Sequence, residues 1–308
     1  MNNLVIELDL FELIRVSGTD ARHFLQGQVS CNMELLSDEY SLIGAICNIK
    51  GRVVSDFRVF ADGDDCLLAV SKGIATEVVK LLSKYAVFSK AEVTIDAQNL
   101  RHYGLLGDAA YEQIGALFGS CPTTPGELLA KDGGKVICLS KQRPRFDIWL
   151  ADKSSDHLTL QKNQTGNGQL EGWLAEDIRA GILHVDSDLS AKYTPALLNY
   201  DLSGVIDFKK GCYTGQEIIA RMHYRGNAKL RMFYAKLESS YAIQPSSVAT
   251  YCRDDKLKEA EILCYLNQAQ SSQLLVLLPA DADQSTAVFL IDNQDNLPLK
   301  IHPLLYNE

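Results

Sequence analysis

The most informative segment of this chain reads Phe208-Lys-Lys-Gly-Cys-Tyr-Thr-Gly-Gln-Glu-Ile-Ile-Ala-Arg-Met-His-Tyr-Arg-Gly226. Its glycines, at positions 211, 215 and 226, let the backbone turn or approach another group closely. Thr214 and Glu217 have the spacing of a helix capping box. The segment therefore predicts a glycine-flanked bend, followed by a short helix that begins near Gly215 and ends near Gly226.

Cys212 lies in this bend, just before the predicted helix and beside two lysines. Nearby positive charge and a helix N-terminus both favour the thiolate, which makes Cys212 a candidate reactive thiol. The alternative is a small buried hydrophobic residue, the commonest state of a free cysteine. The chemistry of the segment leaves both interpretations open.

The charge of the segment differs from that of the whole chain, which carries a formal −9. A local basic group on an acidic protein indicates an anionic ligand or partner, although a solvated helix face is an equally simple explanation. One acid, Glu217, accompanies six basic residues here: Lys209, Lys210, Arg221, Arg225, Lys229 and Arg231.

Residues 210–217, Lys-Gly-Cys-Tyr-Thr-Gly-Gln-Glu, resemble the signature K-G-C-[FY]-x-G-Q-E of the YgfZ family. That family consists of folate-binding proteins related to the T-protein, the aminomethyltransferase of the glycine cleavage system. Residues 18–28, 47–52 and 84–90 also resemble family motifs, namely G-x-D-A-x-x-F-L-Q-G-Q, C-N-x-K-G-R and K-Y-x-x-F-S-K. The resemblance covers most of residues 11–232.

The resemblance implies an α+β fold of the GcvT/YgfZ type, a three-domain ring around a central channel. Two interleaved α+β subdomains would occupy residues 1–232, the smaller at roughly 40–100, and a β-barrel would occupy residues 233–308. The implied function is that of a folate-binding accessory protein for the synthesis or repair of iron–sulfur clusters. Its partners would be enzymes such as tRNA methylthiotransferases, and catalytic turnover is not itself implied.

The resemblance also nominates site residues. Cys212 would be the functional thiol, acting through a transient mixed disulfide, as a cluster ligand or by a folate adduct. Tetrahydrofolate or a derivative would lie against aromatic residues at the positions of Phe11 and Trp173, although a tryptophan on an amphipathic helix is by default a core residue. The remaining cofactor-binding candidates are Lys50, Arg52, Lys210, Tyr213, Gln216, Glu217, Arg221 and Arg225. For Lys50 and Arg52 a plain hairpin turn is the competing interpretation.

An aminomethyltransferase is the alternative function, and two departures count against it. T-proteins carry an acidic pair after the first strand hairpin, where this chain keeps the single acid Asp56. They also carry R-x-E-A-G where this chain reads Asp177-Ile-Arg-Ala-Gly181, so that Arg179 replaces a glutamate. Each change removes a carboxylate that could stabilise charge developing on folate. A thiol enzyme that pairs Cys212 with His223 is a weaker third possibility.

Bulk properties bound the class of protein. The chain has 308 residues, 46% hydrophobic and 22% charged, which is ordinary globular composition. A pI near 5.2 argues against a dedicated nucleic-acid binder, so direct binding of tRNA is not expected. The eight cysteines include no C-x-x-C pair and no zinc-ligand spacing, so we expect reduced thiols and no metal site. Without a signal-like start or a long apolar run, we expect a cytoplasmic protein.

Hydrophobic periodicity predicts the elements. Strands are expected at 11–17, 42–48, 52–60, 66–70, 91–96 and 101–107, and residues 135–150 should be rich in strand. Helices are expected from residue 19 to 29, at 73–85, near 109–118 and from 170 to 181. The short alternating runs at 231–237, 247–251, 259–266, 273–278 and 286–291 predict the C-terminal barrel. We expect Arg143 to Arg145 to form a solvated basic turn, and residues 162–168 to form a surface loop.

Overall fold

The computed structural model describes residues 4–97, 100–151, 167–226, 228–254, 256–292, 295–304 and 306. Most of the predicted loop at 162–168 therefore lies outside the described residues. The chain divides into two compact units, each assembled from separate segments. Unit 1 contains residues 1–170, 184–192 and 205–216, and unit 2 contains residues 171–183, 193–204 and 217–308. This division differs from the predicted boundary at 232/233, because three upstream segments group with the C-terminal strands.

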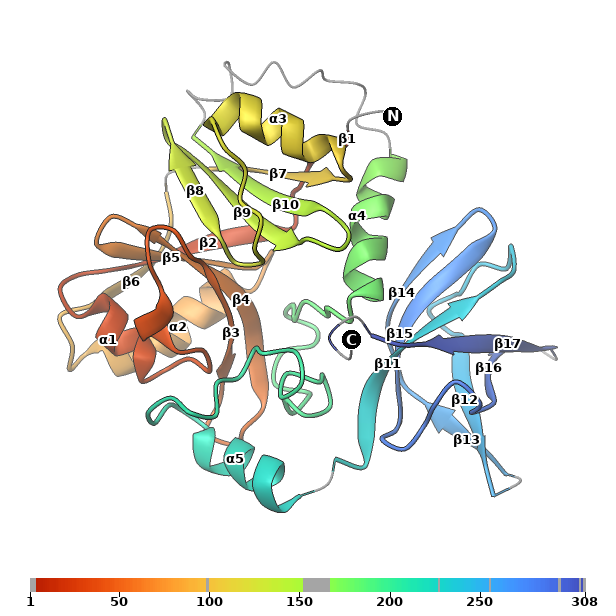
Figure 1. Ribbon diagram of the computed structural model, residues 1–308. Coiled ribbons are helices and arrows are strands. Elements are labelled where there is room, and N and C mark those ends of the chain that lie inside the picture. The colour runs from red at the N-terminus through yellow and green to blue at the C-terminus, as the bar shows by residue number, and fades with distance from the viewer. Residues whose placement is uncertain are drawn as a thin grey trace. The chain divides into compact units, whose positions relative to one another are not determined.

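Unit 1 contains two five-stranded antiparallel sheets (Figure 1). The first has the order β3-β4-β5-β2-β6, made by Leu42–Cys47, Val53–Asp62, Asp65–Ser71, Phe11–Ser17 and Glu92–Ile95. The second has the order β1-β7-β10-β9-β8, made by Leu4–Glu7, Arg101–Leu106, Arg145–Leu150, Gly134–Ser140 and Leu128–Lys131. The predicted strands are therefore present, and those of the first sheet lie between Phe11 and Ile95.

The helices of unit 1 cover the outer faces of these sheets (Figure 1). The first sheet carries α1 (Ala21–Gln26), the short 3-10 helix η1 (Met33–Leu35) and α2 (Ala75–Ala86), and the second carries α3 (Ala109–Phe118). Side chains alternate along each strand, so neighbouring residues enter different layers. Val59 and Leu68 face the helices, whereas Phe60, Leu67 and Trp149 pack between the two sheets. Both faces of β4 and β5 are consequently buried.

Unit 2 is organised around one seven-stranded antiparallel sheet with the order β13-β12-β16-β17-β11-β15-β14. In chain order β11 to β17 are Leu230–Leu237, Val248–Arg253, Lys256–Ala260, Ile262–Gln268, Ser271–Pro279, Val288–Asp292 and Asp295–His302. The predicted strand at 259–266 is thus two strands, and β17 was not predicted. Because Glu261 alone separates β13 from β14, which are opposite edges of the sheet, the sheet must curl. Among the described residues it forms a curled half-barrel.

Two helices belong largely to unit 2. Helix α4 spans Asn167–Arg179, and α5 spans Gln216–Arg225, which confirms the helix predicted from the signature segment. The connection at 193–204 is fixed to the sheet, because the Asn199 side chain donates to the Met232 carbonyl at 2.7 Å. Arg231 binds both carboxylate oxygens of Asp201, at 2.9 and 2.8 Å. In the part of the chain that the structure describes, no helix is long and apolar enough to cross a membrane.

Candidate functional site

The signature segment opens with a loop, residues 207–215, that is bonded to the turn after α1 within unit 1. The Asp207 N–H donates to the Ser30 carbonyl at 3.0 Å, and the Thr214 N–H donates to the Gly27 carbonyl at 3.2 Å. The Thr214 hydroxyl donates to Gln28 Oε1 at 3.0 Å, so Thr214 is held by the turn after α1 rather than serving as a simple helix cap. Both ends of the loop are therefore fixed.

Lys210 is the central anchor of this loop. Its side chain is buried, and its ammonium donates to the carbonyls of Gln26, Val29 and Cys31 at 2.8, 2.6 and 2.7 Å. An ammonium has three N–H donors, so these bonds occupy all of them. Burial lowers the pKa of Lys210 to about 8, while the three carbonyls act in the opposite sense by binding the charged form. In this geometry Lys210 holds the loop and has no donor left for a ligand.

Cys212 differs sharply from its neighbours, because it is exposed whereas Lys210 and Tyr213 are each 7% exposed. The interpretation of Cys212 as a buried hydrophobic residue is therefore wrong, and its sulfur is open to solvent. Burial raises the pKa of the Cys47 thiol to about 12 and that of Cys66 to about 11, as expected for inert core cysteines. Cys252, on β12 of unit 2, is the other cysteine classed as exposed.

Gly215 brings two sequence motifs together in unit 1. Its φ is +84°, a conformation that residues with a Cβ rarely adopt, and a Cβ there would lie 2.6 Å from the Asn48 carbonyl oxygen. The loop consequently packs directly against the β3–β4 turn, which carries the Cys47–Arg52 motif. Two segments that are far apart in sequence thus form one surface.

The β3–β4 turn is preorganised by Asn48. Its side-chain oxygen accepts the N–H groups of Lys50 and Arg52 at 2.9 and 3.1 Å, and Gly51 takes a φ of +68°. The Lys50 side chain is exposed, while the Arg52 guanidinium donates to the Lys192 carbonyl at 2.7 Å. The turn is therefore a hairpin connection that also presents one solvated ammonium and one partly engaged guanidinium.

Tyr213 lies beneath Lys210, whose ammonium is 5.2 Å from the centre of the tyrosine ring. Its hydroxyl is buried and has no hydrogen-bond partner among the described residues. Burial raises the pKa of Tyr213 well above its ordinary value. The half-buried Gln216 donates its backbone N–H to the Tyr213 carbonyl at 3.1 Å. A buried, unpaired hydroxyl is costly, and this one is a polar group that a ligand or water could satisfy.

Phe11 begins β2 and is half-buried at the margin of the layer between the two sheets of unit 1. Its ring makes edge contacts with His184, at a centroid distance of 4.8 Å, and with His102, at 5.5 Å. His102 in turn stacks on Trp149, with ring centres 4.0 Å apart and planes 4° from parallel. Phe11 is thus part of a group of aromatic rings against which the planar ring of a ligand could pack.

The other nominated residues belong to unit 2, so the structure does not join them to Cys212 or Phe11. Trp173, on α4, is 1% exposed and is one of the largest fully buried side chains. Glu217, Arg221 and Arg225 are exposed on α5, where Ile219 is the buried residue. The sequence analysis assigned all of the nominated residues to one site. In the structure some of them belong to unit 1 and the others to unit 2.

Several polar residues of unit 1 were missed from the sequence. His184 binds Asp56, and His102 binds Asp147 at 3.1 Å. Arg145 was expected in a solvated turn, but it is 5% exposed at the start of β10, whose residues are all buried. No local signal reveals the two pairings, because each pair joins segments that are distant in sequence. The charges at 145 and 147 have the spacing of one strand face, which is a usable clue.

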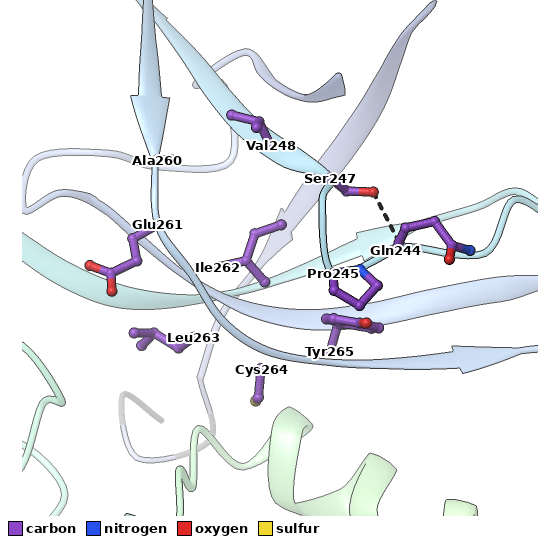
Figure 2. A pocket seen from close by; sticks show the side chains of 10 residues that line it. All are labelled: Gln244, Pro245, Ser247, Val248, Ala260, Glu261, Ile262, Leu263, Cys264 and Tyr265. Carbon is purple, nitrogen blue, oxygen red and sulfur yellow. Dashed lines mark hydrogen bonds between the residues drawn. The ribbon is translucent and has the colours of Figure 1, made fainter. Parts of the chain in front are cut away.

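A separate cavity of about 490 Å³ lies in unit 2 and contains none of the nominated residues. The loop at 244–248 forms one wall, and the chain from Ala260 to Tyr265 forms the other (Figure 2). The Gln244 N–H donates to Ser247 Oγ at 2.9 Å and closes the loop (Figure 2). Among the described residues, no group of His, Cys, Asp and Glu is arranged to hold a metal ion.

The fold has a solved counterpart in the crystal structure of the glycine cleavage system aminomethyltransferase T from Bartonella henselae. The two share 16% sequence identity and a TM-score of 0.78, over 98% of this chain and 85% of that chain. At this level of identity the likeness shows the fold alone. The chain is thus a protein of the T-protein-like, or GcvT-like, fold class.

Similarity to curated proteins narrows this class. The chain is 35% identical over 233 residues to the tRNA-modifying protein YgfZ of Hamiltonella defensa, covering 75% of this chain and 69% of that protein. It is 28% identical over 305 residues to YgfZ of Photorhabdus laumondii, covering 98% and 92%. The corresponding identity to YgfZ of an Escherichia coli strain is 26%. None of the protein-family models matches. The chain belongs to the YgfZ family.

Proposed function

We propose that this protein binds a folate and supports tRNA modification by maintaining or repairing the iron–sulfur clusters of tRNA-modifying enzymes. The observation that carries the proposal is the exposed Cys212 thiol on a loop whose neighbouring side chains, Lys210 and Tyr213, are buried and fixed. A reactive thiol needs access, and a rigid loop lets it meet a partner in one orientation. The relatives named tRNA-modifying protein YgfZ support the tRNA link.

The residues of unit 1 fit the chemistry of a folate. A pterin is a planar, hydrogen-bonding heterocycle, and the half-buried Phe11 edge provides a surface for such a ring. The unpaired Tyr213 hydroxyl adds a polar group. The glutamate tail of folate is anionic, and exposed Lys50 suits it. The GcvT-like neighbour is an aminomethyltransferase, which is consistent with folate as the ligand.

We assign the remaining nominated residues roles within this proposal. Within unit 1, Arg52 supplies further positive charge to the tail, Gln216 contributes a polar group, and Lys210 acts indirectly by holding the loop of Cys212. For Trp173, Glu217, Arg221 and Arg225, which belong to unit 2, a role in folate binding stays a prediction. A three-domain ring with a central channel, a cytoplasmic location and tRNA methylthiotransferases as partners stay predictions.

Two measurements test the proposal. Tetrahydrofolate should bind and quench tryptophan fluorescence, and comparison of the wild type with Trp149→Phe and Trp173→Phe would tell which of the two tryptophans reports binding. The gene should also restore methylthiolated tRNA nucleosides, measured by mass spectrometry, in a bacterial strain that lacks its own YgfZ. Absence of binding at high micromolar ligand removes the folate assignment, and failure to restore the nucleosides removes the tRNA assignment.

The aminomethyltransferase alternative makes a different prediction. In this chain the Asp56 carboxylate is already bonded to His184 and to the Val185 N–H, and Arg179 pairs with Glu176. The Asp56 carboxylate is therefore already occupied by two hydrogen bonds, and position 179 carries a positive charge instead of a carboxylate. We therefore expect no methylenetetrahydrofolate from aminomethylated lipoyl carrier protein and tetrahydrofolate. Turnover in that assay would favour the alternative.

A further inference from the structure

Two neighbouring apolar side chains, Val87 and Phe88, are exposed in the turn between α2 and β6 of unit 1. Phe88 is 96% exposed and Val87 is 74% exposed, and Tyr85 in the last turn of α2 is 38% exposed. No other large hydrophobic side chain of the described residues is as exposed as Phe88. Single exposed hydrophobic residues are ordinary on protein surfaces, whereas a contiguous group of them marks a site of interaction. We call Val87 and Phe88 the apolar tip.

Hydrogen bonds on both sides hold the apolar tip in place. The Ser89 N–H donates to the Ala86 carbonyl at 2.8 Å. Lys90 is bonded twice to Asp20, because its N–H donates to the Asp20 carboxylate at 2.9 Å and its carbonyl accepts the Asp20 N–H at 3.2 Å. A surface that is fixed before binding loses little conformational entropy when a partner covers it. The apolar tip is therefore preorganised for binding.

Gly18 makes this arrangement possible. Its φ is +103°, and a Cβ there would lie 2.2 Å from the Lys90 carbonyl oxygen, so the two segments can approach this closely only at a glycine. Gly18 and Asp20 belong to the motif at 18–28, and the apolar tip belongs to the motif at 84–90. The start of the first motif therefore holds the second motif in place.

The segment that carries the apolar tip is positively charged. Residues 78–91 contain three lysines and no acidic residue, although the whole chain carries a formal −9. All three, Lys80, Lys84 and Lys90, are exposed. An apolar centre with a polar, charged rim is the usual composition of a protein interface. The complementary surface is an apolar pocket with carboxylates at its rim.

These properties favour a different protein as the partner. Nucleic acids and anionic membranes present extended negative charge, which a chain with a net charge of −9 repels outside this small basic segment. A second copy of the chain, placed symmetrically, would set the same lysines against one another. Another protein can instead offer a few carboxylates beside an apolar pocket.

The apolar tip is linked to the Cys212 loop through α1. Asp20, which holds Lys90, directly precedes this helix. At the other end of the helix, the Gln26 carbonyl accepts the Lys210 ammonium at 2.8 Å. Six helical residues rise about 9 Å, so the anchors of the tip and of the loop are close together. An interface of about 800 Å² on each partner extends well beyond this distance, so one partner can contact both.

We propose that the apolar tip docks this protein to the iron–sulfur enzyme that it serves, by inserting Phe88 into an apolar pocket that is rimmed by carboxylates. This inference rests on the proposed function, because the partner is one of the enzymes named there. Phe88 supplies the buried contact, and Lys84 and Lys90 supply the charged rim. Docking through the tip provides the affinity, while the Cys212 thiol provides the chemistry.

The first experiment measures by calorimetry how tightly the full-length protein binds a purified tRNA methylthiotransferase that carries its iron–sulfur clusters. Phe88→Ser should weaken this binding about 30-fold, the scale of one hot-spot residue. The double variant Lys84→Glu, Lys90→Glu should weaken it about tenfold, and added salt should reduce that loss. Cys212→Ala should bind as the wild type does. Absence of binding by the wild type, or equal affinities for the wild type and Phe88→Ser, overturns the inference.

The second experiment measures methylthiolated tRNA nucleosides in the bacterial strain that lacks its own YgfZ. Phe88→Ser should restore at most about one fifth of the wild-type level, because the weakened complex is less occupied. Its midpoint of urea unfolding and its affinity for tetrahydrofolate should not change, since Phe88 is exposed. Leu257→Ser, which alters a 53% exposed leucine of β13 in unit 2, is the matched control and should restore the nucleosides fully.

The same variant tests the other occupants of the apolar tip. Binding of the wild type to tRNA, or to phosphatidylglycerol vesicles, would assign the tip to a nucleic acid or a membrane if Phe88→Ser abolished it. Self-association in sedimentation that Phe88→Ser abolished would assign the tip to a second copy of the chain. Each of these results overturns the inference.

The experiments separate the possible failures. If the wild type does not restore the nucleosides, the proposed function is wrong, and this assignment of the apolar tip is lost with it. If the wild type restores them and Phe88→Ser restores them equally, the proposed function stands and the inference alone is wrong.

Discussion

The two halves of the signature segment have opposite relations to solvent. In the loop at 207–215, Lys210 and Tyr213 are buried, and a web of hydrogen bonds joins the loop to the α1 region. In α5, by contrast, Ile219 is the buried residue, and Glu217, Arg221 and Arg225 are exposed. The motif is continuous in sequence, yet its first half is a loop held by hydrogen bonds and its second half is a helix with exposed charged side chains.

This contrast separates residues that maintain structure from residues that meet partners. In the loop, the Lys210 ammonium is bonded to three backbone carbonyls, which stabilises the fold, while the Cys212 thiol is exposed. The helix contributes little burial, so its arginines are available to an anion. Substitutions in the loop should therefore affect stability or abolish function, and those in α5 should change affinity alone.

The largest effect is expected from Cys212→Ala. We expect it to abolish restoration of methylthiolated tRNA nucleosides, because the thiol is removed while the loop bonds stay in place. Its midpoint of chemical unfolding should match the wild type. Cys252→Ala, which removes another exposed thiol, is the control and should restore the nucleosides fully. Full activity of Cys212→Ala would show that the exposed sulfur has no function.

Lys210→Met should destabilise the protein by about 3 kcal/mol, because it leaves three buried carbonyls without a donor. Lys209→Met is the matched control, since Lys209 is exposed, and it should change stability by no more than about 0.5 kcal/mol. Urea unfolding followed by circular dichroism measures both. Equal stabilities for the two variants would contradict the role of Lys210 as an anchor.

The pH dependence of this difference has a definite sign. Burial lowers the pKa of Lys210 from 10.5 to about 8, so the folded protein releases this proton at a lower pH than the unfolded chain. Between these values the unfolded state binds more protons, and the contribution of Lys210 to stability rises with pH. The wild type should therefore gain stability relative to Lys210→Met between pH 8 and pH 10.5. A constant or shrinking difference would mean that the carbonyls outweigh burial.

The smallest effect is expected on α5. Arg221→Gln and Arg225→Gln should each weaken binding of a polyglutamylated folate about threefold, and the loss should shrink as salt is added. Stability should not change, because both side chains are exposed. Lys258→Gln, on the exposed β13, is the control and should bind as the wild type does. A loss that salt does not reduce would argue against a purely electrostatic role.

Local signals predicted the elements well, because their causes are local. Strand β2 has the predicted bounds, and α5 begins one residue after the predicted start. The error at 259–266 also has a local cause, since alternation continues through Glu261 and hides the change from β13 to β14. Propensity and periodicity describe a strand but not the point at which it bends into another part of a sheet.

The candidate site was predicted only in part. The exposure of Cys212 and the meeting of Gly215 with Asn48 agree with the grouping of the two motifs. The pairing of Asp56 with His184 joins residues 128 positions apart, which no local pattern reveals. Burial of Lys210 was equally hidden, because a lysine beside another lysine in a basic segment gives no sign of which one turns inward.

The chain crosses between its two units five times, at 170/171, 183/184, 192/193, 204/205 and 216/217. No single cut of the gene can separate them. A truncation after residue 232 would also remove Tyr306, whose hydroxyl accepts a hydrogen bond from the Asn199 side chain. Recombination therefore cannot exchange either unit as a module, and the two must be inherited, expressed and varied together.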